Sequence, residues 1–578
     1  MIRITTPRTP PTWALLEREL LRANTAACRE YFARYFDERG FLRCVERWGG
    51  NDGPDDAMES CVDWPLLHAL GADDVVLEMV NRAWEGHLRQ YTQARTTEVP
   101  FARDGMYYKE FPVMFDWLHN GEGLGVFNLL GLSDPQNPAT LQRFRRYAGF
   151  YMNEDPDAPN YDPEHKIIRS LFNGSRGPLL RPATALDWAG DPIEVGHRFK
   201  ARHGERTYEE MLAHFQDYTD VVGDHPSNLA ATSLALNAYL LTHEEKYKDW
   251  LLEYVDAWAE RARANGGLLP SKIGLDGKIG GPSGKWYAGC YGWGFTVVVP
   301  QTGELAHRST TYVGLIGFGN AFLLTGDEKY LDVWRNLLDT INAQSRVVNG
   351  SRVYPHNYGD EGWYNFQPHP YLHGALDLWY WSQQPTDRER LPDNDWLAYL
   401  EGRNPDYPEQ ALQADFARIR ERVEGMRADP TTPDTRLSDD PMVYNPCSVA
   451  SLLHLMLGGI RPSYWGGPLH CRVRYFDPER RRAGLPADVG ALMEKLSADE
   501  TVLTLVNLHQ VEPRTVILQA GAYGEHQIMQ VMQGGREIRV GSPCLSVRLE
   551  PGAGEQLTLR MRLYANRPTL ARPWDRLP

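Results

Sequence analysis

The chain has 578 residues, enough for more than one hydrophobic core, and its 61 Lys and Arg against 76 Asp and Glu give a net charge of −15. This acidic balance argues against nucleic acid and anionic membrane surfaces as partners. The seven cysteines are dispersed and none forms a C-x-x-C pair, so they predict neither a disulfide framework nor a zinc site. No stretch approaches the roughly twenty apolar residues of a membrane span, and no signal segment is visible, so we expect a cytoplasmic protein.

A repeat organises the first two thirds of the chain. Residues 237–247 recur, with conservative changes, as residues 320–330. Each copy predicts a helical hairpin: a helix of small residues, a tight Thr-x-Asp/Glu-Glu turn, and a bulkier amphipathic helix. A repeat this close indicates an array of similar units.

The same template can be laid along the rest of the chain. It predicts inner helices that begin near residues 56, 122, 228, 311, 371 and 447. The outer helices are expected at residues 12–36, 75–91, 141–152, 247–258, 330–341 and 409–426. Six inner and six outer helices predict a mainly α fold, a closed (α/α)6 toroid over residues 1–467.

The pattern changes at about residue 468. Short runs of alternating apolar and polar residues follow, separated by Gly and Pro turns, at 502–508, 515–518, 527–532, 537–540, 545–549 and 556–563. Period-two alternation with short turns is typical of an antiparallel sheet. We therefore expect residues 468–578 to form a β-sandwich domain packed on the toroid and without catalytic groups.

The N-termini of the inner helices should gather at one mouth of the toroid, because all inner helices run in the same direction. The residues before each inner helix are rich in Asp, Glu, His, Asn, Trp, Tyr and Gly, whereas the opposite turns are ordinary helix caps. Acid–base groups and aromatic plates thus converge on one end. This asymmetry predicts the functional site at that mouth.

Carboxylates are the leading catalytic candidates. Asp56, Glu59 and Asp63 share one helix face, and packed like charges raise a pKa so that a general acid stays protonated. The catalytic candidates are Asp55, Asp56, Glu59, Glu122 and Asp224, although any one of them could simply cap a helix. Residues 51–56 could also be a calcium loop, but the EF-hand spacing does not match, so neither a metal nor a cofactor is expected.

Basic and aromatic side chains near the same mouth are candidates for substrate binding. Lys109, Arg176 and Arg308 are suited to a substrate carboxylate. The full set is Lys109, His119, Arg176, His225, Trp286, Tyr287, Trp293, Arg308, Trp363 and His369.

The layout of a toroid followed by a β-sandwich resembles the (α/α)6 barrels of carbohydrate-active enzymes, found in several glycoside hydrolase and polysaccharide lyase families. It is most similar to the β-glucuronidases of glycoside hydrolase family 154. The resemblance covers nearly the whole chain but is one of layout, so no catalytic residue is carried over from it. It implies a hydrolase of polysaccharide degradation and carbohydrate metabolism that removes uronic acids from the ends of acidic oligosaccharides.

Three functions remain open on the sequence. In a hydrolase, one carboxylic acid protonates the glycosidic oxygen and a carboxylate activates water or attacks the anomeric carbon. In a polysaccharide lyase, Asn173 and Arg176 would neutralise a uronate while His225 or Tyr287 abstracts a proton. A non-catalytic glycan-binding protein would need the aromatic residues alone. An acidic oligosaccharide is the expected partner in the first two cases, and a homodimer is possible.

Overall fold

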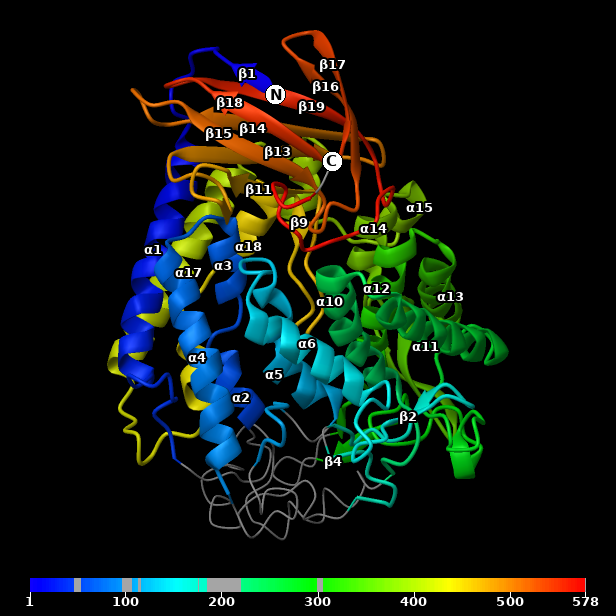
Figure 1. Cartoon of the computed structure of the whole chain (residues 1–578). Helices are drawn as coiled ribbons and strands as arrows, with labels where there is room; N and C mark the ends of the chain where they lie inside the picture. Colours follow the sequence, from blue (N-terminus) through cyan, green and yellow to red (C-terminus); the bar gives the residue numbers. More distant parts are fainter. Residues whose placement is uncertain are drawn as a thin grey trace.

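The computed structural model describes residues 1–45, 54–95, 106–112, 116–174, 176–183, 220–298 and 305–576. A helical domain carries a sheet-rich region formed mainly by the C-terminal part of the chain (Figure 1). Within these ranges, no helix combines the length and the apolar character that a membrane crossing requires.

Six inner segments of the helical domain are found in the described part of the chain. They are α2 (Pro54–Glu59) with α3 (Trp64–Leu70), α5 (Trp117–Leu130), η4 (Pro226–Ala231) with α10 (Thr232–Thr242), η6 (Thr311–Gly314) with α12 (Leu315–Thr325), α14 (Ala375–Ser382), and α18 (Ala450–Leu452) with η8 (Leu453–Leu457). Each begins within five residues of the predicted start. The first is broken between α2 and α3, where Asp63 has a φ of 69° and Pro65 opens the next helix.

Outer helices pack on these segments. They are α1 (Thr12–Tyr35), α4 (Asp74–Gln93), α6 (Pro138–Phe150), α11 (Glu245–Ala264), α13 (Lys329–Asn342) and α17 (Tyr407–Ala428). The predicted apolar stripes of α11 and α13 are buried along their whole length, which confirms the two helical hairpins. The last outer helix returns to the first: Tyr35 of α1 donates a hydrogen bond to Asp429, just after α17, at 2.8 Å.

All six inner segments run in the same direction, as predicted, since their C-terminal ends contact the sheet-rich region or its C-terminal tail. The contacts at these ends pair Gly71 with Leu485, Gly131 with Leu570, Leu240 with Leu570, Phe322 with Tyr564, Trp381 with His470 and Leu457 with Arg472. The N-terminal ends therefore lie at the opposite side of the helical domain.

The sheet-rich region contains two five-stranded sheets. The first has the order β1 (Ile2–Ile4), β18 (Cys544–Leu549), β15 (Arg514–Ala520), β11 (Val473–Asp477) and β12 (Arg482–Ala483); the second has β13 (Val489–Leu496), β14 (Glu500–Asn507), β19 (Gly554–Arg562), β16 (Gln527–Gln533) and β17 (Arg536–Ser542). Neighbours in the described strands are antiparallel, as predicted, except that β1 pairs in parallel with β18. Residues 2–4, which the sequence analysis left with the toroid, thus belong to a sheet of this region.

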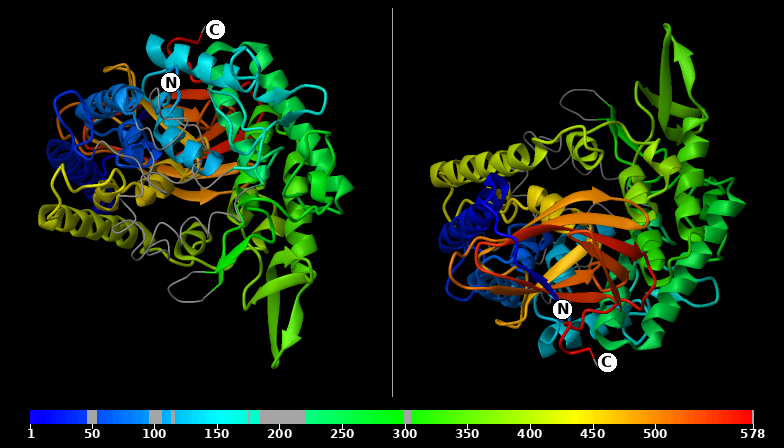
Figure 2. Two further views of the ribbon diagram at one scale, coloured as in Figure 1. Left: turned by 90° about the horizontal axis from the view of Figure 1, so that it is seen from below. Right: turned by 90° about the horizontal axis from the view of Figure 1, so that it is seen from above.

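Smaller elements fill the connections. They are β2 (Tyr161–Asp162), β3 (Ile167–Ile168), η5 (Gly281–Ser283), β4 (Thr296–Val298), β5 (Leu305–His307), β6 (Arg346–Val348), β7 (Ser351–Gly359), β8 (Gly362–Gln367), α15 (Pro385–Arg388), α16 (Asp395–Leu400), η7 (Asp440–Tyr444), β9 (Gly459–Ile460) and β10 (His470–Cys471). The sheet of β6, β7 and β8, which the hairpin template did not predict, projects from the helical domain (Figure 2).

The connection between β9 and β10 runs along the glycine-rich face of α5. Asn128 of α5 donates a hydrogen bond to the Gly466 carbonyl at 2.8 Å. A Cβ atom on Gly121 would lie 2.6 Å from the Trp465 carbonyl oxygen, so only glycine permits this approach. The contact fixes Tyr464 and Trp465 beside the first two turns of α5.

Candidate active site

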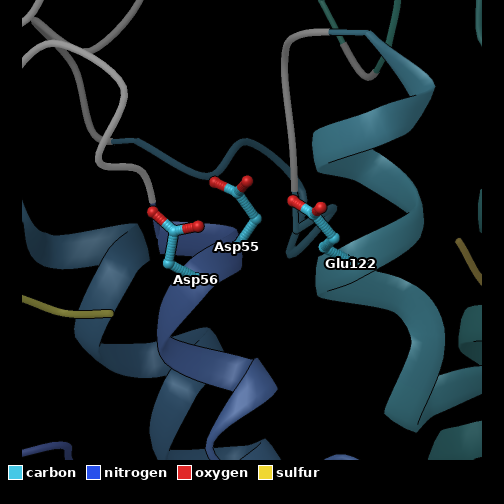
Figure 3. Close-up of side chains that lie close together, drawn as sticks. All are labelled: Asp55, Asp56 and Glu122. Carbon is cyan, nitrogen blue, oxygen red and sulfur yellow. The ribbon is translucent and has the colours of Figure 1, made fainter. Parts of the chain in front are cut away.

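Three carboxylates from two inner helices converge at the N-terminal end of the helical domain. Asp55 and Asp56 project from α2 and Glu122 projects from α5, with one oxygen of each lying within 4.8 Å of the others (Figure 3). The helices approach closely because Gly123 of α5 faces Asp55, whose Cβ atom would lie 3.3 Å from a Cβ on that glycine. The predicted approach of Glu122 to the carboxylates of the first helix is present in the structure.

Burial shifts the protonation of this cluster. Asp55 is fully buried, and neither of its carboxylate oxygens has a hydrogen-bond partner among the described residues. Burial raises the pKa of Asp55 to about 7, although His119 counteracts this. Burial, followed by the charge of Glu59, raises the pKa of Glu122 well above its usual range. The cluster therefore holds protons at neutral pH, as a general acid requires.

Glu59 extends the cluster from the last turn of α2. Burial raises its pKa to about 7, a hydrogen bond with Tyr464 lowers it, and the charge of Asp439 raises it. Tyr464 thus links the acidic cluster to the segment between β9 and β10, which runs along α5.

An ion pair stands beside the carboxylates. Asp116 caps α5 by accepting hydrogen bonds from the backbone N–H groups of Leu118 and His119, at 2.9 and 3.3 Å. The His119 Nδ1 atom lies 2.9 Å from the same carboxylate oxygen. Burial opposes protonation of His119, but Asp116, with Asp55 and Glu122, raises its pKa well above the usual range. The site accordingly contains one imidazolium among several acids.

An aromatic cavity of about 420 Å³ adjoins the cluster through Tyr464, which lines the cavity and forms the hydrogen bond with Glu59. Tyr312 stacks on His373, with ring centroids 4.7 Å apart, and meets the edge of Trp465 at 5.3 Å. Burial and then the charge of Glu122 raise the pKa of Tyr312, which places that ring near the acidic cluster. Asp377 also lines the cavity, and burial raises its pKa to about 6. Aromatic rings with a few polar groups are the usual lining of small-molecule sites.

A second cavity, of about 360 Å³, lies beside Glu59 and is lined by Arg418, Arg422 and Arg461. Arg461 pairs with Asp63 at 2.7 Å, and Arg422 donates to the Asn445 carbonyl at 3.0 Å. Burial lowers the pKa of Arg422, and the charge of Arg418 lowers it further. The structure thus brings cations next to Glu59 that the sequence analysis did not select.

Asp224 differs from the other four predicted catalytic residues. It is fully buried and accepts five hydrogen bonds, from the backbone of Ile168 and His225 and from the side chains of Asn228, Tyr254 and Trp258, at 2.9 to 3.2 Å. Both oxygens are therefore occupied in joining η4 to α11 and the β3 strand. This environment is that of a structural hub.

Two of the three predicted cations, Lys109 and Arg176, share the ring of Tyr108, whose centroid lies 5.1 Å from the Lys109 ammonium. Lys109 forms an ion pair with Asp155, which raises its pKa. Arg176 lies over the ring of Tyr108 at 5.3 Å. Arg308 follows β5, and its backbone N–H donates to the Phe295 carbonyl at 3.0 Å.

The remaining predicted residues are either buried in the hydrophobic core or partly exposed at the surface. Trp293 is 1% exposed and donates to the Leu269 carbonyl at 2.7 Å, so it supports the core. Burial, followed by the charge of Lys272, lowers the pKa of His225 well below its usual range. Partly buried rings form a cluster around Tyr358, consisting of Trp286, Tyr287 and Trp363. His369 is exposed and packs against His356, with ring centroids 5.1 Å apart.

Sequence reasoning missed Asp116, Tyr312, Arg461, Tyr464 and Trp465. The available signal for the last two was the Tyr-Trp-Gly-Gly run at residues 464–467, in which large rings stand beside flexible residues outside any periodic segment.

The three clustered carboxylates also form a set of oxygen donors of the kind that hard cations such as Ca²⁺ prefer. The unused oxygens of Asp55 are compatible with such an ion. Residues 51–53 of the calcium loop considered from the sequence lie outside the described residues.

A family model described as "Domain of unknown function (DUF8034)" matches residues 2–353 and 392–453, well over half of the chain. The chain belongs to this family. None of the curated proteins matches this chain.

Among solved structures, this DUF8034 protein is similar to a β-1,3-1,4-glucanase from Paenibacillus sp. X4, with 9% identity, a TM-score of 0.32, and coverage of 78% of this chain and 94% of that chain. It is also similar to cellobiose 2-epimerases. The enzyme from Bacillus thermoamylovorans has 10% identity and a TM-score of 0.23, and the match covers 60% of this chain and 92% of that chain. The enzyme from Spirochaeta thermophila has 14% identity and a TM-score of 0.22, and the match covers 61% of this chain and 92% of that chain. At these TM-scores the likeness carries no argument about function.

Proposed function

We propose that this protein is a carbohydrate-active enzyme of the (α/α)6 type, and specifically a glycoside hydrolase. The observation that carries the proposal is the convergence of Asp55, Asp56, Glu59 and Glu122 beside an aromatic cavity, with raised pKa values at Asp55, Glu59 and Glu122. Glycoside hydrolysis needs one protonated and one ionised carboxyl group on either side of the scissile bond. Differently buried carboxyl groups at one site meet that need.

Glu122 is the proposed general acid, because burial and the neighbouring carboxylates favour its protonated form. Asp56 is the proposed nucleophile or base, since it stands across from Glu122 and is 9% exposed. Inverting enzymes hold their carboxyl groups about 6.5–9.5 Å apart to admit a water molecule, and retaining enzymes about 5–5.5 Å apart. The nearest oxygens of the three clustered carboxyl groups lie within 4.8 Å of one another, and the anomeric configuration of the product distinguishes the two mechanisms.

The proposed substrate is an acidic oligosaccharide with a terminal uronic acid, as for a β-glucuronidase. Its support is the cavity beside Glu59, where Arg418, Arg422 and Arg461 could receive a carboxylate. We add these residues to the predicted cations Lys109, Arg176 and Arg308, because they line a cavity beside Glu59. A cytoplasmic location and a homodimer remain predictions from the sequence.

The test is a panel of nitrophenyl glycosides that includes a β-glucuronide, assayed with the wild type and with Asp56→Asn and Glu122→Gln variants. Loss of a general acid–base group lowers the rate about 10²–10⁴-fold. Glu78→Gln on the exposed side of α4 is the matched control and should keep full activity. Near-normal turnover in both site variants would contradict the assignment.

A lyase is the second candidate, favoured by the neutral, buried His225 beside Lys272. Only a lyase forms an unsaturated uronate, which absorbs in the ultraviolet. Appearance of that product from a uronate polymer, with no glycoside hydrolysed, would replace the hydrolase by the lyase.

A further inference from the structure

A third cavity, of about 390 Å³, lies where α1, the end of α3 and the strands that follow β11 meet. It is at the end of the first inner segment away from Asp55, because Gly71, which follows α3, is part of its wall. Five arginines line it, namely Arg18, Arg22, Arg29, Arg480 and Arg482, against two carboxylates, Asp73 and Asp477. On a chain with a net charge of −15, this is a local concentration of arginines, which Glu17, Glu19 and Asp74 also approach.

Helix α1 supplies three of the five cations from one face. Arg18, Arg22 and Arg29 are spaced by four and seven residues, which places them on the same side of an α-helix. The side chains of Arg22 and Arg29 are 66% and 56% exposed. Their ion pairs, with Glu19 at 3.2 Å and Asp73 at 3.5 Å, are of the exposed kind that contributes little and can yield to a ligand.

Arg18 supplies the buried part of the site. It is 6% exposed, and one of its N–H groups donates to the Val489 carbonyl at 3.3 Å, whereas its Nε atom has no partner among the described residues. Burial lowers its pKa to about 10, against the attraction of Glu17 and with further lowering by Arg22 and Arg482. A buried guanidinium with an unused N–H and like-charged neighbours is stabilised by an anion in the same cavity.

The other two arginines form a fixed wall. Arg482 donates to the Ala72 carbonyl at 2.6 Å and pairs with Asp74. Arg480 pairs with the second oxygen of Asp74 at 2.5 Å. These contacts join the end of α3 to the sheet-rich region and hold both cations in place without a ligand.

We propose that this cavity binds a tetrahedral oxyanion, the phosphate or sulfate group of a small ester. The cavity lining contains arginines and no lysine, and the planar guanidinium fork matches such oxyanions with paired hydrogen bonds. At about 390 Å³ the cavity has the size of small-molecule sites, so it also has room for the group that carries the anion. The binding is separate from the proposed glycoside hydrolysis and does not depend on it.

The test is isothermal titration of the full-length protein with inorganic phosphate, sodium sulfate, glucose 6-phosphate and, as the neutral probe, glucose. The variants are Arg22→Glu with Arg29→Glu, and Arg22→Lys with Arg29→Lys. Arg420→Glu, an exposed arginine of α17, is the matched control. Because both target side chains are more than half exposed, the variants should fold, and circular dichroism checks this.

We expect the wild type and Arg420→Glu to bind the oxyanions alike, glucose not to bind, and the double Glu variant to bind at least about tenfold more weakly. The double Lys variant should bind the oxyanions with intermediate affinity, because it keeps the positive charges and loses the planar guanidinium groups that make paired hydrogen bonds. Tighter binding of glucose 6-phosphate than of phosphate would identify an ester as the ligand, and equal binding would identify the free ion. No binding by the wild type, or equal binding by the wild type and the double Glu variant, would overturn the proposal.

Discussion

The Nδ1 atom of His119 lies 2.9 Å from the Asp116 carboxylate that caps the same helix, so the first turn of α5 presents an ion pair to the acidic cluster. The positive end of the helix dipole and the imidazolium both lie near Asp55 and Glu122. Without them, the ionised forms of three carboxyl groups at this spacing would repel one another strongly.

Replacing Asp116 by Asn should lower the pKa of His119, and the titration of its imidazole by NMR measures this. Because folding raises the pKa of His119 above its usual 6.5, its protonation contributes stability that is fully present below about pH 6.5 and is lost as the pH rises through the folded pKa. The Asp116→Asn variant should therefore be destabilised more at pH 6 than at pH 10. An unchanged imidazole titration would contradict the ion pair.

Replacing Asp55 by Asn should stabilise the protein at high pH. Folding raises the pKa of Asp55 to about 7, so its stability cost grows as the pH rises from about 4 to above 7. We expect a gain on the order of 4 kcal/mol in unfolding free energy at pH 8 and little gain at pH 4, since one pKa unit corresponds to about 1.4 kcal/mol. Urea unfolding at both pH values checks this, with Glu78→Gln unchanged at either pH. A gain of the same size at pH 4 would point to a cause other than titration.

Replacing Asp224 by Ala should lower the free energy of unfolding of the protein without abolishing its enzymatic activity. The substitution leaves buried donors such as the Tyr254 hydroxyl and the Trp258 N–H unsatisfied, at a cost of about 3 kcal/mol or more. The exposed Asp249 of α11 provides the control, Asp249→Ala, which should be neutral. If an Asp224→Asn variant kept the stability of the wild type but lost turnover, Asp224 would be a catalytic residue as the sequence predicted.

Replacing Gly121 by Ala should displace the connection that carries Trp465. Its Cβ atom would lie 2.6 Å from a backbone oxygen, whereas that of Gly125→Ala would lie 3.3 Å from the Tyr464 carbonyl oxygen. We expect Gly121→Ala to lose about 1–3 kcal/mol of stability and Gly125→Ala clearly less. Thermal unfolding and glycoside turnover of the two variants can be compared directly. Equal stability and turnover of the two variants would mean that the segment between β9 and β10 can shift away from α5 without loss of stability.

Replacing Arg418 by Ala should raise KM for a β-glucuronide about tenfold or more, with kcat and the KM for a neutral glycoside little changed. Arg418 is exposed in the cavity beside Glu59, whereas Arg420, two residues along α17, does not line it. Arg420→Ala is therefore the control. A matching rise of KM for the neutral glycoside would argue against carboxylate recognition.

The helical framework could be predicted because its signal is local. The stripes of α11 and α13 repeat every three to four residues within a single segment, and the common direction of the inner helices follows from the hairpins. The approach of Glu122 to Asp55 follows in turn, since both lie within the first two turns of neighbouring inner segments.

Other features depend on contacts that no local pattern records. Tyr464 reaches Glu59 through a non-periodic connection far along the chain, and Arg418 looks like part of an ordinary solvated helix face. Asp224 has the residue type of a catalyst, but its five hydrogen bonds become visible only in three dimensions. The three residues of β1 are too few to show an alternation that identifies a strand.

The pairing of β1 with β18 also sets an order of events during synthesis. Ile2 pairs with Val547 and Ile4 with Leu549, so β1 has no partner until the residues that separate the two strands have been made. At about 5–20 residues per second, that interval is roughly 30–110 s. For that time Ile2 and Ile4 remain an uncovered apolar edge, which a chaperone can hold and a second nascent chain can capture.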